Sequence, residues 1–113
     1  MAGVGTAKIF ENDRIAIWEL ALAPGEKTGV HTHRHDYVFY VIEGSRLETY
    51  DAKEAPLFEF DASSGDVFVL RCEGGELVMG EGDGIRVSAT HGARNIGPTR
   101  YREILVETKK PAA

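Results

Sequence analysis

Residues 25–44 read GEKTGVHTHRHDYVFYVIEG, and this stretch decides the fold. It places the pair His31 and His33 just before an apolar run from Tyr37 to Ile42. In an extended chain, the side chains of residues i and i+2 point to the same face about 7 Å apart, so two imidazoles can reach one centre. Glycines close the stretch at both ends, as is typical of strands joined by tight turns. The pattern predicts a strand-rich fold with two histidines on one face.

The rest of the chain consists of short segments rich in β-branched and aromatic residues, separated by glycines. Thirteen glycines punctuate the 113 residues, and several segments alternate with a period of two, without a sustained helical period. Connections too short for helical crossovers imply antiparallel pairing. This pattern predicts an all-β sandwich or barrel. The expected strands are Arg14–Ala23, Tyr37–Ile42, Arg46–Tyr50, Leu57–Phe60, Val67–Leu70, Glu76–Met79, Ile85–Ser88 and Tyr101–Glu107.

Length and composition indicate one domain over residues 1–113, with residues 1–6 and 109–113 loosely ordered. The net charge of −5 is spread without basic clusters, which argues against a nucleic-acid partner. No apolar stretch reaches membrane-spanning length, and the N-terminus lacks the pattern of a signal peptide. Cys72 is the single cysteine, so an intramolecular disulfide is impossible and a cytoplasmic location is expected.

The segment from Cys72 to Gly84, CEGGELVMGEGDG, is unusually rich in glycine and acidic residues. Two interpretations remain open for it. Glycine-rich hairpins are common on the surfaces of all-β proteins, and this interpretation is favoured. The alternative is a flap beside a binding site.

The spacing within residues 25–44 matches a known family motif: a glycine, five residues, H-x-H, three or four residues, a glutamate, six residues and a glycine. Gly25, His31, His33 and Gly44 hold the matching positions, and Tyr37 stands in the place of the glutamate. On these residues the chain resembles the cupin superfamily, and within it the small single-domain cupins.

The second motif of that family ends in a histidine, three residues and an asparagine, which His91 and Asn95 match. Its opening is less clear. Gly65-Asp66 before an apolar strand is the preferred opening, with about fifteen residues inserted before His91. Gly80 is the alternative opening.

The resemblance spans Ile15 to Glu107, and what it implies goes beyond the residue pattern. It implies a cupin-like double-stranded antiparallel β-barrel, or jelly roll. It also implies that His31, His33 and His91 bind a divalent metal ion: Fe, Zn, Ni or Mn. Small cupins commonly form dimers through N-terminal strands, so a homodimer is expected, with Ala7–Ala23 as the interface.

The tyrosine in the glutamate position leaves three alternatives. Three neutral histidines could hold the metal alone, leaving positions open for an anionic ligand. Tyr37 could bind the metal as a phenolate, if its pKa falls far below about 10. Tyr37 could instead donate a hydrogen bond to a metal-bound water or ligand. His35 continues the histidine alternation and could supply a fourth nitrogen, although a residue at the rim of the site is the favoured interpretation.

These features favour an enzyme that acts on a small anionic molecule at a three-histidine metal centre. The resemblance extends to three-histidine iron dioxygenases, and isomerisation or hydrolysis with Tyr37 as the catalytic proton donor fits nearly as well. The alternative is a non-catalytic module of the same fold that binds a metal or a small molecule. A metal-free barrel would require the three histidines to be a coincidence.

Overall fold

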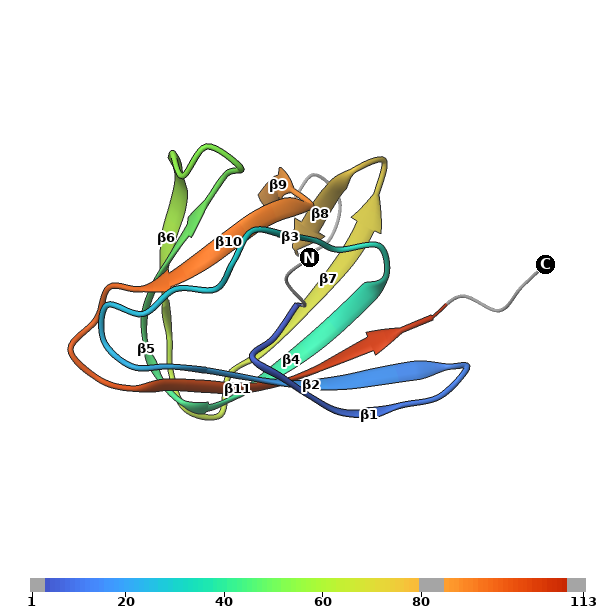
Figure 1. The fold of residues 1–113 in the computed structure, drawn as a ribbon, viewed down its shortest axis with the longest axis horizontal. Coiled ribbons are helices and arrows are strands. Elements are labelled where there is room, and N and C mark those ends of the chain that lie inside the picture. The colour runs from blue at the N-terminus through green and yellow to red at the C-terminus, as the bar shows by residue number, and fades with distance from the viewer. Residues whose placement is uncertain (1–3, 80–84, 110–113) are drawn as a thin grey trace.

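The computed structural model describes residues 4–79 and 85–109, and in these residues the chain is all-β, as the sequence predicts. The strands follow one another along the chain without a helix (Figure 1). Their bounds are β1 Ala7–Glu11, β2 Ile15–Leu22, β3 His31–Thr32, β4 Asp36–Glu43, β5 Ser45–Tyr50, β6 Pro56–Ala62, β7 Val67–Glu73, β8 Glu76–Met79, β9 Ile85–Ser88, β10 Thr90–Asn95 and β11 Tyr101–Thr108.

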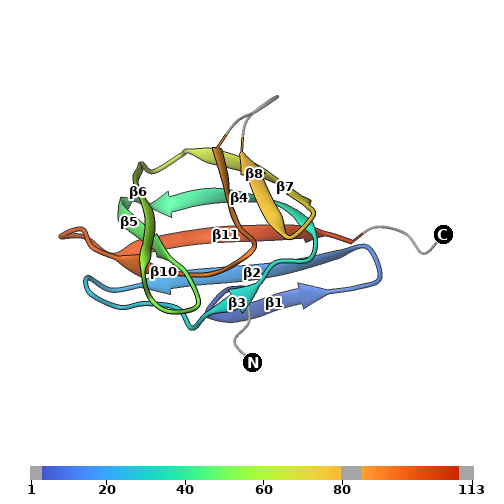
Figure 2. The same cartoon turned by 90° about the horizontal axis from the view of Figure 1, so that it is seen from above.

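Two antiparallel sheets form the barrel. The larger has seven strands in the order β1-β2-β11-β4-β7-β8-β9, and the smaller has four in the order β3-β10-β5-β6. The sheets face each other, with β3 and β10 lying across from β2, β11 and β4 (Figures 1 and 2). This is the double-stranded antiparallel barrel that the sequence resemblance implies.

Strand β11 shows how the sequence selects the inner face. Its burial alternates strictly from Tyr101 to Glu107, so residues 101, 103, 105 and 107 point into the barrel. Leu105 lies between Trp18 of β2 and Phe39 of β4 in register, and both neighbours belong to the core or pack against it. The acids Glu103 and Glu107 share this inward face with the apolar residues.

Tyr50 is the largest fully buried side chain of the smaller sheet, at 1% exposure, and its position requires a glycine in the neighbouring strand β10. Its ring fills the space above Gly92, where an added Cβ would lie 2.3 Å from the ring carbon Cζ. The Tyr50 hydroxyl donates a hydrogen bond to the backbone carbonyl of Thr28. Packing in this layer therefore requires a residue without a side chain at position 92.

All eight expected strands overlap observed ones, but three observed strands were not among them: β1, β3 and β10. Every residue of β1 is exposed, so it carries no buried face that the sequence could reveal. Strand β3 has only two residues. Strand β10, with the sequence THGARN, buries polar residues rather than apolar ones, so the hydrophobic pattern is absent.

The glycine-rich segment forms a hairpin as far as it is described. Strands β7 and β8 pair through a turn at Gly74 and Gly75, both with positive φ, as in the turn type that suits two-residue hairpins. The remainder, residues 80–84, lies outside the described residues, and so does Gly80 as a motif opening. Near the chain ends, Val4 is buried in the core and Lys109 forms an ion pair with Glu11, so these residues are held in place.

Candidate metal centre

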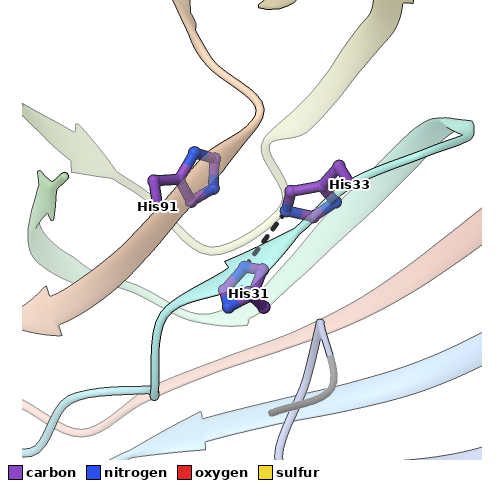
Figure 3. Close-up of side chains that lie close together, drawn as sticks. All are labelled: His31, His33 and His91. Carbon is purple, nitrogen blue, oxygen red and sulfur yellow. Dashed lines mark hydrogen bonds between the residues drawn. The ribbon is translucent and has the colours of Figure 1, made fainter. Parts of the chain in front are cut away.

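Three histidines from two neighbouring segments meet inside the barrel. His31 in β3 and His91 in β10 are directly opposite in the strand register, and the backbone N–H of His33 donates to the carbonyl of Ala89. The later strand β10 therefore lies beside the H-x-H pair. All three imidazoles are at most 7% exposed and turn toward one another (Figure 3).

Backbone carbonyls orient two of the rings. The Nδ1–H of His31 donates to the carbonyl of Gly29 at 2.9 Å, and that of His91 donates to the carbonyl of Ser88 at 2.8 Å. A neutral imidazole with its proton on Nδ1 has a free lone pair on Nε2. Both rings are therefore fixed in the tautomer that a metal needs at Nε2.

His33 is held differently. Its Nδ1 is buried and has no hydrogen-bond partner among the described residues. Its ring stacks on Tyr37 instead, with centroids 4.4 Å apart and planes 16° from parallel. This stacking directs the His33 Nε2 to within 3.1 Å of the His31 Nε2 (Figure 3).

The separation of the His31 and His33 Nε2 atoms fits two ligands of one divalent ion. Two ligands about 2.1 Å from one metal lie roughly 3.0 to 3.4 Å apart in octahedral or tetrahedral geometry, and the His31–His33 separation is 3.1 Å. One nitrogen from each histidine lies within 4.8 Å of the others. Imidazole nitrogens suit iron, zinc and nickel, whereas magnesium and calcium prefer oxygen ligands.

Burial keeps the three histidines neutral. Loss of hydration lowers the pKa of His33 to about 2, and the neighbouring His91 and His31 lower it further. The pKa of His91 falls to about 4 for the same main reason, against an opposing effect of its hydrogen bond to Ser88. The pKa of His31 is also lowered by burial. Neutral imidazoles at physiological pH are ready to bind a metal without first losing a proton.

Tyr37 has the environment of a neutral phenol. It is 6% exposed on the inner face of β4. Burial raises its pKa, and the charges of Glu103, Cys72 and Glu107 raise it further. A phenolate ligand would require the metal to overcome all these effects, so the structure disfavours that alternative. The stacking contact with His33 places Tyr37 beside the centre.

The other residues singled out in the sequence lie around the three histidines rather than among them. His35 sits at a bend after His33, is half-buried, and is not part of the group of nitrogens within 4.8 Å. The carboxylate of Asp36, between His35 and Tyr37, accepts the backbone N–H of Cys72. The Asn95 side chain is fully buried and bonds to the backbone at Leu22, Thr99 and Gly97 and to the side-chain hydroxyl of Ser45.

Two buried carboxyl groups near the centre, those of Glu103 and Glu107, were not identified from the sequence. Glu103 accepts the hydroxyl proton of Tyr101 at 2.6 Å, and burial raises the pKa of Glu103 to about 7. Glu107 accepts the indole N–H of Trp18 at 2.7 Å. The available signal was the period of two in the last strand, which places both acids on the same face as Tyr101 and Leu105.

The histidines open into a cavity of about 70 Å³ inside the barrel. Its walls are mainly apolar and aromatic, including Phe39, Phe58, Phe60 and Phe68. Glu103 and Tyr37 line it, and no lysine or arginine among the described residues does. The cavity therefore accommodates a small and largely apolar molecule next to the three nitrogens.

Comparison with solved structures supports the fold. No protein-family model matches the chain, and no curated protein matches it significantly. A cupin domain from Bordetella pertussis Tohama I matches with a TM-score of 0.65 at 18% identity, covering 94% of this chain and 97% of that one. A protein with a double-stranded β-helix domain from Klebsiella pneumoniae matches with a TM-score of 0.55 at 18% identity, covering 94% and 72%.

An RmlC-like cupin from Shewanella frigidimarina is similar with a TM-score of 0.52 at 19% identity, covering 91% of this chain and 73% of that one. The chain therefore has the fold of a small cupin, and three buried histidines that could hold a metal ion lie inside its barrel. Among the described residues there is no helix long and apolar enough to cross a membrane.

Proposed function

We propose that this chain is a metal-binding cupin that holds a divalent cation with His31, His33 and His91. The observation that carries the proposal is the pair of hydrogen bonds to Gly29 and Ser88, which fix two rings with Nε2 free toward the third histidine. Histidines that served only packing would not need buried, desolvated nitrogens facing one another.

Elemental analysis of the tag-free protein tests this proposal. We expect close to one equivalent of transition metal in the wild-type protein and its loss in His31→Ala and His91→Ala. His35→Ala is the matched control, because His35 belongs to the same H-x-H-x-H run but lies outside the nitrogen group. Absence of metal from the wild-type protein, both as purified and after incubation with Fe, Zn, Ni or Mn salts, would refute the proposal.

The cavity defines the class of ligand. Since no lysine or arginine among the described residues lines it, the metal is the cation available to an anionic group there. The phenylalanine walls favour an apolar body next to that group. We therefore propose a small molecule with one anionic, metal-chelating end and an apolar remainder as the ligand.

Catalysis is the favoured use of this arrangement. A bound divalent ion would supply a Lewis-acid centre and, in the case of iron, a redox centre. The chain's own residues would exclude water with the aromatic wall and keep Tyr37 protonated beside the ligand as the proton donor. Oxygen uptake with iron-loaded protein and a panel of thiols, diketones and aromatic acids tests dioxygenation. Tyr37→Phe, assayed for isomerase and hydrolase turnover, tests the proton-donor role.

A non-catalytic binding module is the second candidate. The observation in its favour is that Tyr37 and Glu103 are the only ionisable side chains besides the histidines among the described residues that line the cavity. Calorimetric binding of a panel compound to the metal-loaded protein, without oxygen uptake or product formation, would identify this function.

We also propose a homodimer formed through the N-terminal strands, Ala7–Ala23. Strand β1 is a sheet edge whose outer side pairs with no other described strand, and its Ile9 and Phe10 are 56% and 49% exposed. An exposed apolar edge strand readily pairs with another chain. Light scattering after size exclusion should give twice the monomer mass, and Phe10→Lys should shift the protein toward monomer. A wild-type monomer at high concentration would contradict this.

A further inference from the structure

Glu107 occupies a position from which its charge can reach the metal centre. In the register of the larger sheet, Glu107 of β11 lies directly opposite Tyr37 of β4. Both side chains point into the barrel, and Glu107 is 7% exposed. Directly opposed residues of antiparallel strands have Cβ atoms about 4.5 to 5.5 Å apart. The carboxylate is therefore on the same interior row as the tyrosine that replaces the expected glutamate.

The charge of Glu107 has no cationic partner in the part of the chain that the structure describes. Its Oε1 accepts a hydrogen bond from Trp18 Nε1–H at 2.7 Å, and no ion pair among the described residues includes it. A buried carboxylate is costly unless a positive charge or several hydrogen bonds compensate it. One neutral indole donor compensates only part of that cost.

Glu107 also acts electrostatically on the three-histidine centre. Its charge raises the pKa of His31, opposing the effect of burial, and it contributes to the raised pKa of Tyr37. Its oxygens are nevertheless not part of the group of ligand atoms within 4.8 Å of one another. Glu107 therefore acts on the centre from just outside the three nitrogens.

We propose that Glu107 supplies the negative charge that balances the divalent cation, in place of the carboxylate missing at position 37. The inference rests on the proposed three-histidine metal centre and adds a fourth, anionic component to it. Glu107 stabilises the bound ion by its charge, and Trp18 holds the carboxylate in that position. Three neutral imidazoles and one carboxylate leave a net charge of +1 rather than +2 at the centre.

The alternative is a purely structural Glu107 that anchors Trp18. Glutamine distinguishes the two roles, because its amide oxygen can still accept the indole N–H while the negative charge is lost. Glu76 of β8 provides the control: its carboxylate is exposed and is not part of the cavity wall that contains the histidines. Both substitutions replace a carboxylate by an amide of nearly equal size.

The test is the affinity for Zn²⁺ alone, measured at pH 7 by competition with a chromophoric chelator, for the wild-type protein, Glu107→Gln and Glu76→Gln. We expect Glu107→Gln to bind about one equivalent with roughly 10- to 100-fold lower affinity, as for other residues that support metal ligands. Glu76→Gln should stay within about threefold of the wild-type affinity. Equal affinities for the wild-type protein and Glu107→Gln would overturn this inference while leaving the three-histidine centre intact.

A wild-type protein that binds no Zn²⁺ would instead refute the metal centre itself. Circular dichroism must show that Glu107→Gln is folded before its affinity is interpreted. If Glu107→Gln is not folded, the test is the infrared difference between the spectra with and without one equivalent of Zn²⁺, measured for the wild-type protein and for Glu103→Gln. A shift of a carboxylate stretch is expected in both proteins, and no carboxylate shift would overturn the role of Glu107.

Discussion

Replacing Glu103 with glutamine should remove a pH-dependent cost to stability. Glu103 is fully enclosed, with the Tyr101 hydroxyl at 2.6 Å as its hydrogen-bond donor. Burial raises its pKa from 4.5 to about 7, although the Tyr101 hydrogen bond opposes the rise. Glutamine has the same shape, keeps an oxygen for the Tyr101 hydroxyl, and never ionises.

The sign follows from proton binding. Between pH 4.5 and 7 the folded protein holds a proton on Glu103 that the unfolded chain has released, so stability falls as the pH rises through this range. A shift from 4.5 to about 7 corresponds to roughly 3 kcal/mol in full. About 2.5 kcal/mol of this is lost between pH 5 and pH 8.

Urea denaturation of the metal-free proteins at pH 5 and pH 8 measures the effect. The free energy of unfolding of Glu103→Gln minus that of the wild-type protein should rise by about 2.5 kcal/mol from pH 5 to pH 8. Taking this difference cancels the contribution of the histidines, which has the opposite sign. Glu76→Gln, at an exposed site in β8, serves as the control and should show a change within about 0.5 kcal/mol. A difference that does not vary with pH would show that Glu103 ionises in the folded state as it does in water.

The remaining predictions concern the histidines, Tyr37 and two packing residues. Acid should destabilise the metal-free Glu103→Gln protein, in which the opposing titration of Glu103 is removed, between pH 6.5 and 4, because the unfolded chain takes up protons that buried His91 does not bind. The share of His91 is about 3 kcal/mol at pH 4, and thermal melts of this variant with unchanged midpoints from pH 6.5 to 4.5 would contradict this. Tyr37→Phe should keep the Zn²⁺ affinity of the wild-type protein within a few-fold in a chelator competition, because the Tyr37 ring stacks on His33 and does not bind the metal. A loss of affinity above tenfold would instead support Tyr37 as a phenolate ligand. Asn95→Ala should lower the free energy of unfolding, measured by urea denaturation, by about 2 to 4 kcal/mol, because four hydrogen bonds are lost at a fully buried position. A decrease below 1 kcal/mol would mean that water replaces these hydrogen bonds. Gly92→Ala should lower the melting temperature by several degrees through its clash with Tyr50, and equal melting temperatures would refute the clash. Gly74→Asn, which gives the Asn-Gly order preferred in a two-residue hairpin turn, is the milder comparison.

The strands with one apolar face could be predicted from the sequence, because alternation reports which side is buried. Strand β11 is the clearest case, with the inward residues Tyr101 and Leu105 in strict alternation. Strand β10 could not be found in this way. Its inward residues include His91 and Asn95, and these are buried because the backbone carbonyls of Ser88 and Leu22 accept hydrogen bonds from their side chains. A local hydrophobic pattern carries no information about such partners.

The H-x-H pair predicted its own geometry, but the rest of the centre depended on the pairing of distant strands. His91 joins the pair because β10 runs antiparallel to β3 in a register that puts His91 opposite His31. The family resemblance anticipated this neighbour, whereas spacing along the chain could not. The orienting carbonyls of Gly29 and Ser88 were also beyond prediction, since any residue type offers a backbone carbonyl.

The role of Tyr37 shows why a motif that runs along one strand gives an incomplete account of a barrel interior. Along β4 the carboxylate is absent, which on its own predicts a centre with full +2 charge. Across the sheet, Glu107 lies opposite Tyr37 and faces the same interior, so the neighbouring strand offers a carboxylate on that row. The two positions are about 5 Å apart at Cβ, so the carboxylate that β11 carries lies close to the row that position 37 occupies. An aromatic ring at position 37 can then orient His33 by stacking while the charge comes from β11. Because electrostatic attraction depends on where a charge lies and not on which strand carries it, a substitution in a ligand motif has to be weighed against every inward residue of the strands beside it.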